Sequence, residues 1–238
     1  MSIIAVTLPT LNEADNIGLL IREIRALSKD IHIVVADDDS PDGTPKIVEE
    51  IRRLDPKVHL LLRKVDKGRG RAGVDAFRYA LQLGAEYIVE MDADFSHDPK
   101  YIPRLLAQME SADVAIGSRF AKGGRESGRG TLRKRLTSLS CAYGRLMLGV
   151  PIQDMNSGFR CFRRELLQKI EWHRFLSTGP SIVQELNYRC FLQGARFVEV
   201  PITFHQRQRG RSKLSVTRLL QTALMILKLR YLESSGLL

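Results

Sequence analysis

Two aspartates separated by one residue, Asp92 and Asp94, form the pair whose spacing most suggests chemistry in this sequence. They follow the apolar run 87–91, which is typical of a buried strand. Carboxylates at the end of such a strand repel each other unless a cation or hydrogen-bond donors satisfy them. Mg²⁺ and Mn²⁺ prefer oxygen ligands and can link carboxylates to a diphosphate. The spacing therefore favours a divalent-metal site, although an isolated pair of this kind also occurs by chance or as a helix cap.

Polar residues also follow two earlier apolar runs. Residues 9–13 follow the first run, and residues 37–43, which include three consecutive aspartates, follow the second. Each segment has a structural alternative, because Asn12 can cap a helix and Ser-Pro-Asp-Gly is a strong turn sequence. The three polar segments occur together at predicted strand ends, which favours one shared site.

The elements that would position these residues alternate along the first half of the chain. The predicted strands are 3–8, 31–36, 58–62, 87–91 and 114–117, and the predicted helices are 14–27, 45–54, 72–83 and 101–110. Such alternation implies parallel strands joined by right-handed crossovers. We expect an α/β fold with a Rossmann-like, open, mostly parallel sheet and helices on both faces. Ligands of such sheets bind at the carboxyl ends of the strands, where the polar segments lie.

The second half is predicted to begin with a mobile, glycine-rich basic loop at 122–130. A basic amphipathic helix follows at 132–148, with Leu132, Leu136, Leu139, Tyr143 and Leu146 on its apolar side. After a loop at 154–160, helices are predicted at 165–170 and 181–192, strands at 196–200 and 202–205, and a last amphipathic helix at 216–232. The last helix has one apolar face, formed by Val216, Leu219, Leu220, Ala223, Leu224, Leu227 and Tyr231. Core packing and contact with a membrane surface both explain such a face.

Charge is divided unequally along the chain. Residues 1–118 hold 15 Lys/Arg against 20 Asp/Glu, a net of −5, whereas residues 119–238 hold 22 against 7, a net of +15. A basic half is compatible with nucleic-acid binding, but no zinc-finger spacing, RRM signature or interleaved aromatic residues support it. The sequence Gly68-Arg69-Gly70-Arg71-Ala72-Gly73 matches a dinucleotide-binding pattern but follows the third strand, so a loop contacting phosphates or ribose is the preferred interpretation.

The three scattered cysteines suggest neither a disulfide framework nor a zinc site, and they fit a reducing compartment. We expect no signal peptide, because the N-terminus lacks a basic region before its apolar residues. No transmembrane helix is expected either, because Lys228 and Arg230 interrupt the best candidate.

Eight segments of the chain, in order and at nearly the expected spacing, resemble the dolichol-phosphate mannose synthase branch of the inverting family 2 glycosyltransferases. They are PTLNEADN (9–16), ADDDSPDGT (36–44), GRGRAGVDAFRYA (68–80), MDADFSHDP (91–99), IGSRF (116–120), DMNSGFR (154–160), VEVPITF (198–204) and RQRGRSK (207–213). The resemblance covers essentially the whole chain and implies the GT-A fold. It also implies a catalytic domain at 1–213, with a nucleotide and metal half at 1–118 and an acceptor half at 119–213, followed by a membrane-interface helix at 214–238.

The resemblance also assigns roles to individual residues. It implies nucleotide contacts for Pro9, Leu11, Glu13, Ala36, Asp38, Asp92 and Ala93, and Mg²⁺ or Mn²⁺ ligands at Asp92, Asp94 and Ser96. The implied catalytic set is Asp94 with Arg119, Arg133, Arg207 and Lys213, whose cationic groups would hold the diphosphate and the acceptor phosphate. Asp154 is expected to order its loop. Leu11 stands where the family usually has tyrosine, and Ser96 where archaeal-type members often have glutamine.

The implied reaction is transfer of a hexose, mannose from GDP-mannose, to a polyprenyl phosphate with inversion, at the cytoplasmic face of a membrane. The residues agree with this reaction, because a lipid phosphate is already anionic and needs charge neutralisation rather than a general base. UDP-glucose or another nucleotide sugar stays open as the donor. A non-enzymatic binder of nucleic acid or acidic membranes stays open as a different class.

Overall fold

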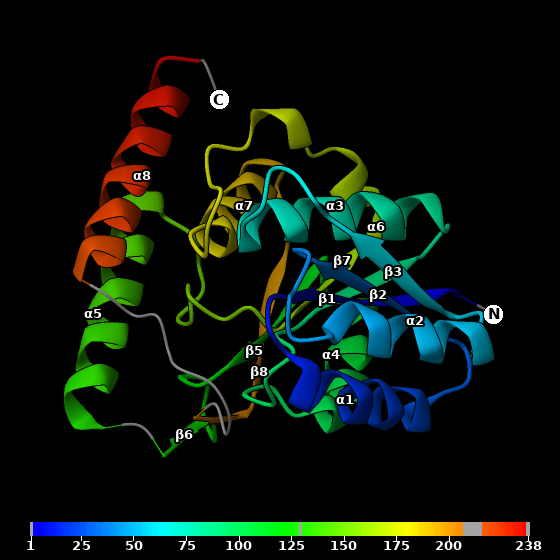
Figure 1. Cartoon of the computed structure of the whole chain (residues 1–238). Coiled ribbons are helices and arrows are strands. Elements are labelled where there is room, and N and C mark those ends of the chain that lie inside the picture. The colour runs from blue at the N-terminus through cyan, green and yellow to red at the C-terminus, as the bar shows by residue number, and fades with distance from the viewer. Residues whose placement is uncertain (1, 129, 207–215, 237–238) are drawn as a thin grey trace.

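The chain folds around one seven-stranded sheet with helices on both faces (Figure 1). The structure is a computed structural model that describes residues 2–128, 130–206 and 216–236, with the backbone alone of 216–219. The strand order is β3-β2-β1-β4-β7-β5-β8, and every neighbouring pair is parallel except those that β7 makes with β4 and β5. These strands are β1 (Ile4–Thr10), β2 (Ile31–Asp37), β3 (Val58–Leu62), β4 (Tyr87–Glu90), β5 (Val114–Ser118), β7 (Arg160–Arg163) and β8 (Phe197–Pro201). The predicted α/β fold with a mostly parallel sheet is therefore confirmed.

The helices divide between the two faces of the sheet. The α-helices are α1 (Ala14–Leu27), α2 (Thr44–Leu54), α3 (Arg69–Gln82), α4 (Ile102–Ala107), α5 (Thr131–Leu148), α6 (Arg164–Gln168), α7 (Ile182–Leu192) and α8 (Val216–Ser234). Short 3-10 turns at Pro99–Tyr101, Gln108–Glu110 and Trp172–Arg174 complete the helical elements. Apolar residues of α1, α2 and α4 form one buried cluster with the strands, and those of α3, α5, α6, α7 and α8 contribute to a second. The rows of β-branched residues in β1 and β2 are buried on both sides, as expected for strands inside a parallel sheet.

Two strands were not predicted from the sequence. Residues 122–130 were predicted to be a mobile loop, but β6 (Arg125–Ser127) lies within them and pairs in parallel with β9 (Thr203–His205). The predicted loop at 154–160 ends where β7 begins, and β7 is antiparallel to both of its neighbours. Its sequence, Arg-Cys-Phe-Arg, lacks an apolar run. The charge of Arg160 is tolerated inside the sheet because Glu90 lies directly opposite it in the ladder.

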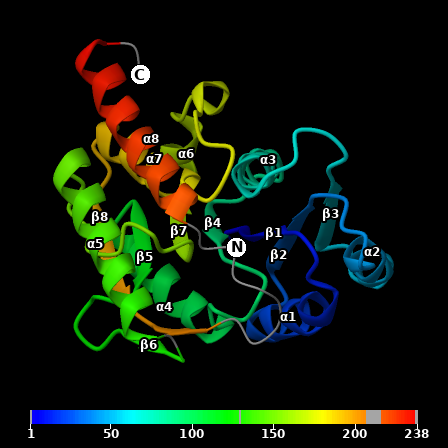
Figure 2. The same cartoon turned by 60° about the vertical axis from the view of Figure 1, so that its left-hand side comes forward.

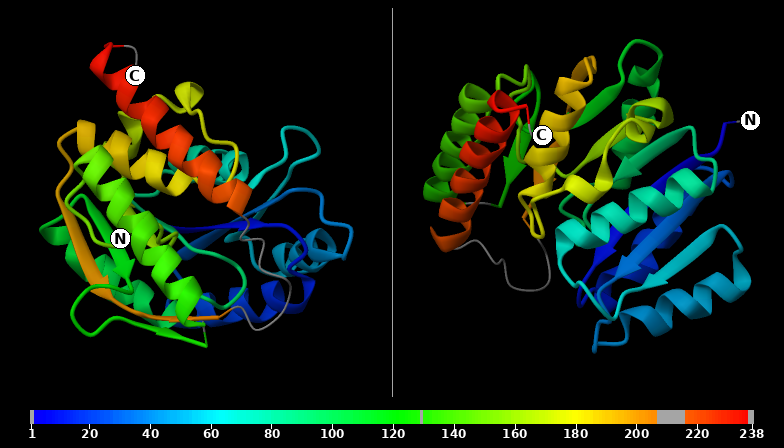
Figure 3. Two further views of the ribbon diagram at one scale, coloured as in Figure 1. Left: turned by 90° about the vertical axis from the view of Figure 1, so that its left-hand side faces the viewer. Right: turned by 90° about the horizontal axis from the view of Figure 1, so that it is seen from above.

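Helices α5 and α8 lie side by side on one flank of the molecule (Figures 2 and 3). The Tyr143 hydroxyl donates a hydrogen bond of 3.3 Å to the carbonyl oxygen of Ala223, and Gly144 faces Ile226. The leucine stripes of both helices nevertheless point outward: the exposed residues are Leu132, Leu136, Leu139 and Leu146 of α5, and Leu220, Leu224, Leu227 and Tyr231 of α8. Core packing therefore does not account for these apolar faces. In the described part of the chain, no helix combines the length and the apolar character that crossing a bilayer requires.

Candidate functional site

The polar segments after β1 and β2 are bonded to each other. In the register of the two strands Thr10 lies opposite Asp37, and the Thr10 hydroxyl donates a 2.7 Å hydrogen bond to the Asp37 carboxylate. Asp37 also accepts from the backbone N–H and the hydroxyl of Ser40. Asp37 is fully buried, so its three hydrogen bonds satisfy a carboxylate that would otherwise be costly. This aspartate ties the end of β1 to the turn after β2.

The turn after β2 caps helix α1. The backbone N–H groups of residues 12, 13 and 14 donate to Ser40, Thr44 and Asp42, each at 2.9 Å. Residue 14 is the first residue of α1, so Asp42 satisfies an N–H group that the helix leaves unpaired at its first turn, and the other two bonds hold the residues just before the helix. Burial by itself would raise the pKa of Asp42, but hydrogen bonds from Thr44 and the N–H of residue 14 hold that pKa below its usual value. The turn therefore has the structural role that its sequence suggested, and it also holds the 11–13 loop in place.

The residues expected to contact the nucleoside differ in accessibility. Leu11 is 43% exposed beside the partly buried Pro9, so its side chain is free to lie against a planar base. Glu13 is buried and accepts a 2.8 Å hydrogen bond from Asn16. Ala36 is fully buried in the core. Of these residues, Leu11 offers the most open surface.

The Asp38 carboxylate is held on both oxygens. Arg63 donates to Oδ1, and the backbone N–H of Gly68 donates to Oδ2 at 2.6 Å. Arg63 is held in turn by Asp75 at 2.7 Å and by the carbonyl of Asp66. Asp38 thereby fixes the start of the 68–73 loop next to the β2 end of the site, which the sequence did not indicate.

Asp92 and Asp94 lie where the fourth strand ends, with different exposure. The Asp92 side chain is 36% exposed, whereas Asp94 is buried and its Oδ1 accepts the N–H of Ser96 at 3.0 Å. Ala93 between them is buried. Ser96 is also buried, and its hydroxyl oxygen has no hydrogen-bond partner among the described residues. A buried hydroxyl without a partner beside an acidic pair fits a hard cation, which would give it an oxygen-to-metal contact.

The described residues hold no group of three or more His, Cys, Asp or Glu side chains that would bind a metal alone. A set of two carboxylates and one hydroxyl would leave coordination positions for ligand oxygens and water, which is how Mg²⁺ is commonly bound beside phosphates. The donor set fits Mg²⁺ or Mn²⁺ and does not resemble a zinc site.

His97, which sequence reasoning did not single out, lies against this acidic pair. Burial lowers its pKa, and the neighbouring aspartates only partly oppose that effect. The N–H of Asp92 donates to Nδ1 of His97 at 3.1 Å, so the neutral ring carries its proton on Nε2. The ring also stacks on Phe159 at 5.2 Å between centroids. His97 thus fixes the backbone of Asp92 and joins it to the 157–160 segment.

Arg69, Glu90 and Arg160 form a charged chain behind Asp92. Arg69 donates to Glu90 through Nη1 and to Asp92 through Nη2, both at 2.9 Å. Arg160, fully buried, donates to the other Glu90 oxygen, to the carbonyl of Val183 and to Asn187. Burial alone would raise the pKa of Glu90, but the two arginines outweigh it and hold that pKa low. These roles were not predicted, because nothing in a single sequence shows that residues 69 and 160 face residue 90.

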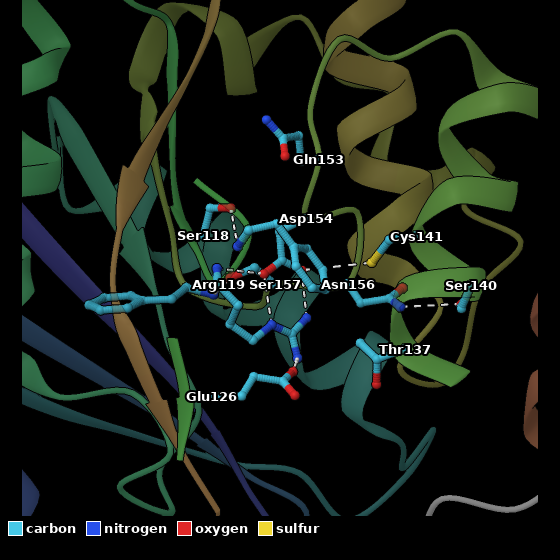
Figure 4. A network of polar contacts seen from close by, with 12 residues as sticks. Ser118, Arg119, Glu126, Thr137, Ser140, Cys141, Gln153, Asp154, Asn156 and Ser157 are labelled. Carbon is cyan, nitrogen blue, oxygen red and sulfur yellow. Dashed lines mark hydrogen bonds and ion pairs between the residues drawn. The ribbon is translucent and has the colours of Figure 1, made fainter. Parts of the chain in front are cut away.

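Arg119 lies at the centre of a second charged cluster (Figure 4). Its guanidinium pairs with both oxygens of Asp154, at 2.7 Å and 2.5 Å, and its Nη1 donates to Glu126 at 3.1 Å. Asp154 is fully buried and also accepts the Arg119 backbone N–H. Its own N–H donates to Glu199 at 3.0 Å. Asp154 therefore orders its loop by holding Arg119, and Arg119 is already engaged by two carboxylates.

Helix α5 passes beside this cluster. Cys141 lies 3.8 Å from Asp154, and burial, reinforced by that carboxylate, raises the pKa of its thiol to about 12. Thr137 lies nearby in Figure 4, and its hydroxyl donates to the carbonyl of Arg133 one turn earlier. Helix α5 thus lies against the Arg119 cluster at Cys141, and Arg133, near its start, is half-buried. Arg207 and Lys213, the other two expected phosphate-binding residues, lie outside the described residues.

Comparisons with known proteins identify the family of this chain. The family model for Glycosyl transferase family 2 matches residues 5–171. Polyprenol monophosphomannose synthase of Mycolicibacterium smegmatis is 40% identical over 88% of this chain and 80% of its own length. Undecaprenyl-phosphate mannosyltransferase of Micrococcus luteus is 38% identical over 87% and 86%. Dolichol-phosphate mannosyltransferase of Pyrococcus furiosus is 34% identical over 89% of this chain and 59% of its own length.

Solved structures agree on the fold. Glucosyl-3-phosphoglycerate synthase of Mycobacterium tuberculosis, crystallised with Mn²⁺, UDP and phosphoglyceric acid, superposes with a TM-score of 0.69. The match covers 100% of this chain and 80% of that one at 20% identity. The same enzyme crystallised with Mg²⁺ and UDP gives a TM-score of 0.68. The ordered segments, the fold and the extent of the family match together place this chain in glycosyl transferase family 2.

Proposed function

We propose that this protein transfers a hexose, mannose from GDP-mannose, to the phosphate of a polyprenyl phosphate and inverts the anomeric carbon. The observation that carries the proposal is the Asp92 and Asp94 pair at the carboxyl edge of the sheet, beside the buried Ser96 hydroxyl. The three relatives are named as a polyprenol monophosphomannose synthase, an undecaprenyl-phosphate mannosyltransferase and a dolichol-phosphate mannosyltransferase, which supports the same substrate class.

Asp92, Asp94 and Ser96 would hold the divalent cation, with Asp94 already fixed by the N–H of Ser96. When bound, the cation supplies charge neutralisation for the departing nucleoside diphosphate. Pro9, Leu11 and Glu13 would line one side of the nucleoside, with the backbone around Ala36 and Asp38 on the other. This arrangement would put the diphosphate between the ends of β1 and β4.

The acceptor phosphate is already negatively charged, so it needs no proton acceptor. The site has to supply cations and hold the phosphate close to the anomeric carbon. Arg119 and Arg133 are the described candidates for this role, and Arg207 and Lys213 belong to the same proposal. His97 is not required as a base, since its Nδ1 already accepts a hydrogen bond from Asp92.

The exposed leucine stripes of α5 and α8 would lie on the membrane surface at the cytoplasmic face. Exposed Arg135, Arg145 and Lys228 accompany the leucines on these two helices. Apolar side chains flanked by basic ones are the pattern of helices that lie in the interface of an anionic bilayer. This position would bring the lipid acceptor's phosphate to the basic half of the protein.

A donor panel tests the proposal. Purified protein is incubated with radiolabelled GDP-mannose, UDP-glucose or other nucleotide sugars, a polyprenyl phosphate and Mn²⁺, and the lipid product is extracted. We expect mannolipid from GDP-mannose, and its loss with a chelator or with Asp94→Ala. Transfer from UDP-glucose instead would correct the donor. No lipid-linked sugar from any donor would refute the proposal, and chelator-insensitive binding of nucleic acid would favour a binding module instead.

A further inference from the structure

We propose that Arg69 binds the donor diphosphate and positions Asp92, as a further cation of the site supplied by the acidic half of the chain. The inference rests on the proposed function and extends it to a residue that the family resemblance did not assign. Arg69 is the first residue of α3, directly after the loop that Asp38 holds.

The guanidinium connects the buried and the exposed part of the site. Nη1 bonds Glu90, which is fully buried, and Nη2 bonds Asp92, whose side chain is 36% exposed. The Arg69 side chain itself is 22% exposed. An arginine has five N–H donors, so two bonds leave three that no acceptor among the described residues occupies. Arg69 therefore keeps donors available beside the carboxylate expected to lie nearest the cation.

Glu90 does not depend on Arg69 as its only source of positive charge. Arg160 pairs with the other Glu90 oxygen from the adjacent strand and is itself anchored to Val183 and Asn187. An arginine side chain stays protonated in proteins, so Arg69 keeps its positive charge at the partly exposed rim of the site.

The position of Arg69 is fixed by its surroundings. The N–H of Gly70 donates to the carbonyl of Thr178 at 3.0 Å, which ties the loop to the segment before α7. A Cβ on Gly70 would lie 2.8 Å from the carbonyl carbon of Thr178, so this approach requires glycine. A Cβ on Gly158 would lie 2.9 Å from Nη2 of Arg69, so the glycine leaves the space that the guanidinium occupies. The guanidinium is therefore already ordered before a ligand binds, which lowers the entropic cost of binding.

The comparison with Arg119 indicates which cation is available to the diphosphate. Arg119 is 5% exposed and holds two carboxylates, Asp154 and Glu126. Arg69 is more exposed and adjoins Asp92 directly. A diphosphate bound through a cation to the acidic pair would come within reach of the free N–H groups of Arg69, and charge-assisted bonds from arginine to phosphate are among the stronger polar contacts in proteins.

The test compares four variants by calorimetric titration with GDP and with GMP in Mn²⁺, using UDP and UMP in parallel. Arg69→Gln removes the charge, Arg69→Lys keeps it without spanning both carboxylates, and Gly158→Ala displaces the guanidinium without removing it. Arg71→Gln, at an exposed residue of the same helical turn, is the matched control.

We expect Arg69→Gln to weaken the binding of the nucleoside diphosphate by about tenfold or more and that of the monophosphate by no more than about twofold. Arg69→Lys should fall between wild type and Arg69→Gln, Gly158→Ala should weaken the diphosphate selectively, and Arg71→Gln should match wild type. Equal losses for both nucleotides, or no loss, would overturn the proposal.

If Arg69→Gln does not fold, Gly158→Ala and Arg69→Lys decide by the same comparison. Lipid product assays with wild type separate this inference from the proposed function. If the variants lose affinity for the diphosphate selectively but wild type makes no lipid-linked sugar, Arg69 remains a nucleotide ligand and the proposed polyprenyl-phosphate acceptor is refuted. Normal transfer with unchanged diphosphate affinity in the variants refutes the role of Arg69 alone.

Discussion

A residue chosen from the sequence as an anion ligand can already be occupied, and Arg119 is such a residue. Asp154 and Glu126 both bond its guanidinium, and all three side chains are almost completely buried. Removing one partner from this cluster should destabilise the fold, because it leaves a buried charge with less compensation. Arg119 would therefore act on a phosphate only from a geometry that Asp154 sets.

Asp154→Ala should lower the free energy of unfolding by about 3 kcal/mol, because Arg119 would then be buried with Glu126 alone. Urea denaturation at neutral pH measures the change. Asp30→Asn, at an exposed position, should shift it by no more than about 0.5 kcal/mol. A wild-type-like stability for Asp154→Ala would mean that the pair contributes nothing net.

Ser96 permits a sharper test of the acidic site. Its hydroxyl has no hydrogen-bond partner among the described residues, so Ser96→Ala should leave the unfolding free energy within about 0.5 kcal/mol of wild type in the absence of metal. If the hydroxyl is a cation ligand, the Mn²⁺ concentration for half-maximal nucleotide binding should rise several-fold. An unchanged metal titration would exclude Ser96 from the cation site.

At the scale of elements, strands β2 and β3 carry a histidine pair remote from the acidic site. His32 Nδ1 lies 3.1 Å from His59 Nε2, and His59 Nδ1 lies 3.2 Å from the Tyr79 hydroxyl on α3. Burial lowers the pKa of both histidines below 6.5, with nearby positive charge as the next cause for His32. The neutral pair can share one proton between the rings, whereas two protonated rings would repel each other.

The pH dependence follows from these lowered values. The folded state binds fewer protons than the unfolded state just below pH 6.5, so this contribution to stability is present above that pH and is lost as pH falls below it. Thermal unfolding between pH 7.5 and pH 5 should therefore show a steeper decline for wild type than for a His32→Gln, His59→Gln double variant. Parallel curves would show that the pair does not contribute.

The exposed leucines of α5 and α8 are expected to contribute to membrane binding. Leu139→Glu, Leu146→Glu and Leu224→Glu each place a charge on an exposed leucine stripe and should reduce co-sedimentation with phosphatidylcholine and phosphatidylglycerol vesicles at a 7:3 ratio by several-fold. Leu54→Glu, at an exposed leucine of α2, is the control and should bind like wild type. If the variants bind vesicles normally but change the sedimentation coefficient, the stripes contact a second copy of the chain instead.

Across the whole molecule, helices and strands with a clear apolar pattern were predicted well from the sequence. Elements and roles that depend on contacts between distant residues were predicted poorly. Helix α1 and strand β3 begin and end where their patterns placed them, because apolar periodicity depends on near neighbours. The strand at Arg160 was missed, because the partner that compensates its buried charge, Glu90, lies seventy residues away in sequence. The sequence and the resemblance predicted Asp92, Asp94 and Ser96 as metal ligands and the 68–73 loop as a phosphate or ribose contact. The bonds of Arg69 to Glu90 and Asp92, and the place of His97 beside Asp92, became evident only in three dimensions.

Strand β7 connects the two differently charged halves. It belongs to the basic half, yet it pairs with β4 on one side and β5 on the other, both from the acidic half. One continuous hydrogen-bonded ladder therefore runs beneath both the acidic pair and the Arg119 cluster. The halves cannot open and close as two lobes around a hinge without breaking that ladder, so any adjustment to substrates has to come from loops and flanking helices while the floor of the site stays rigid.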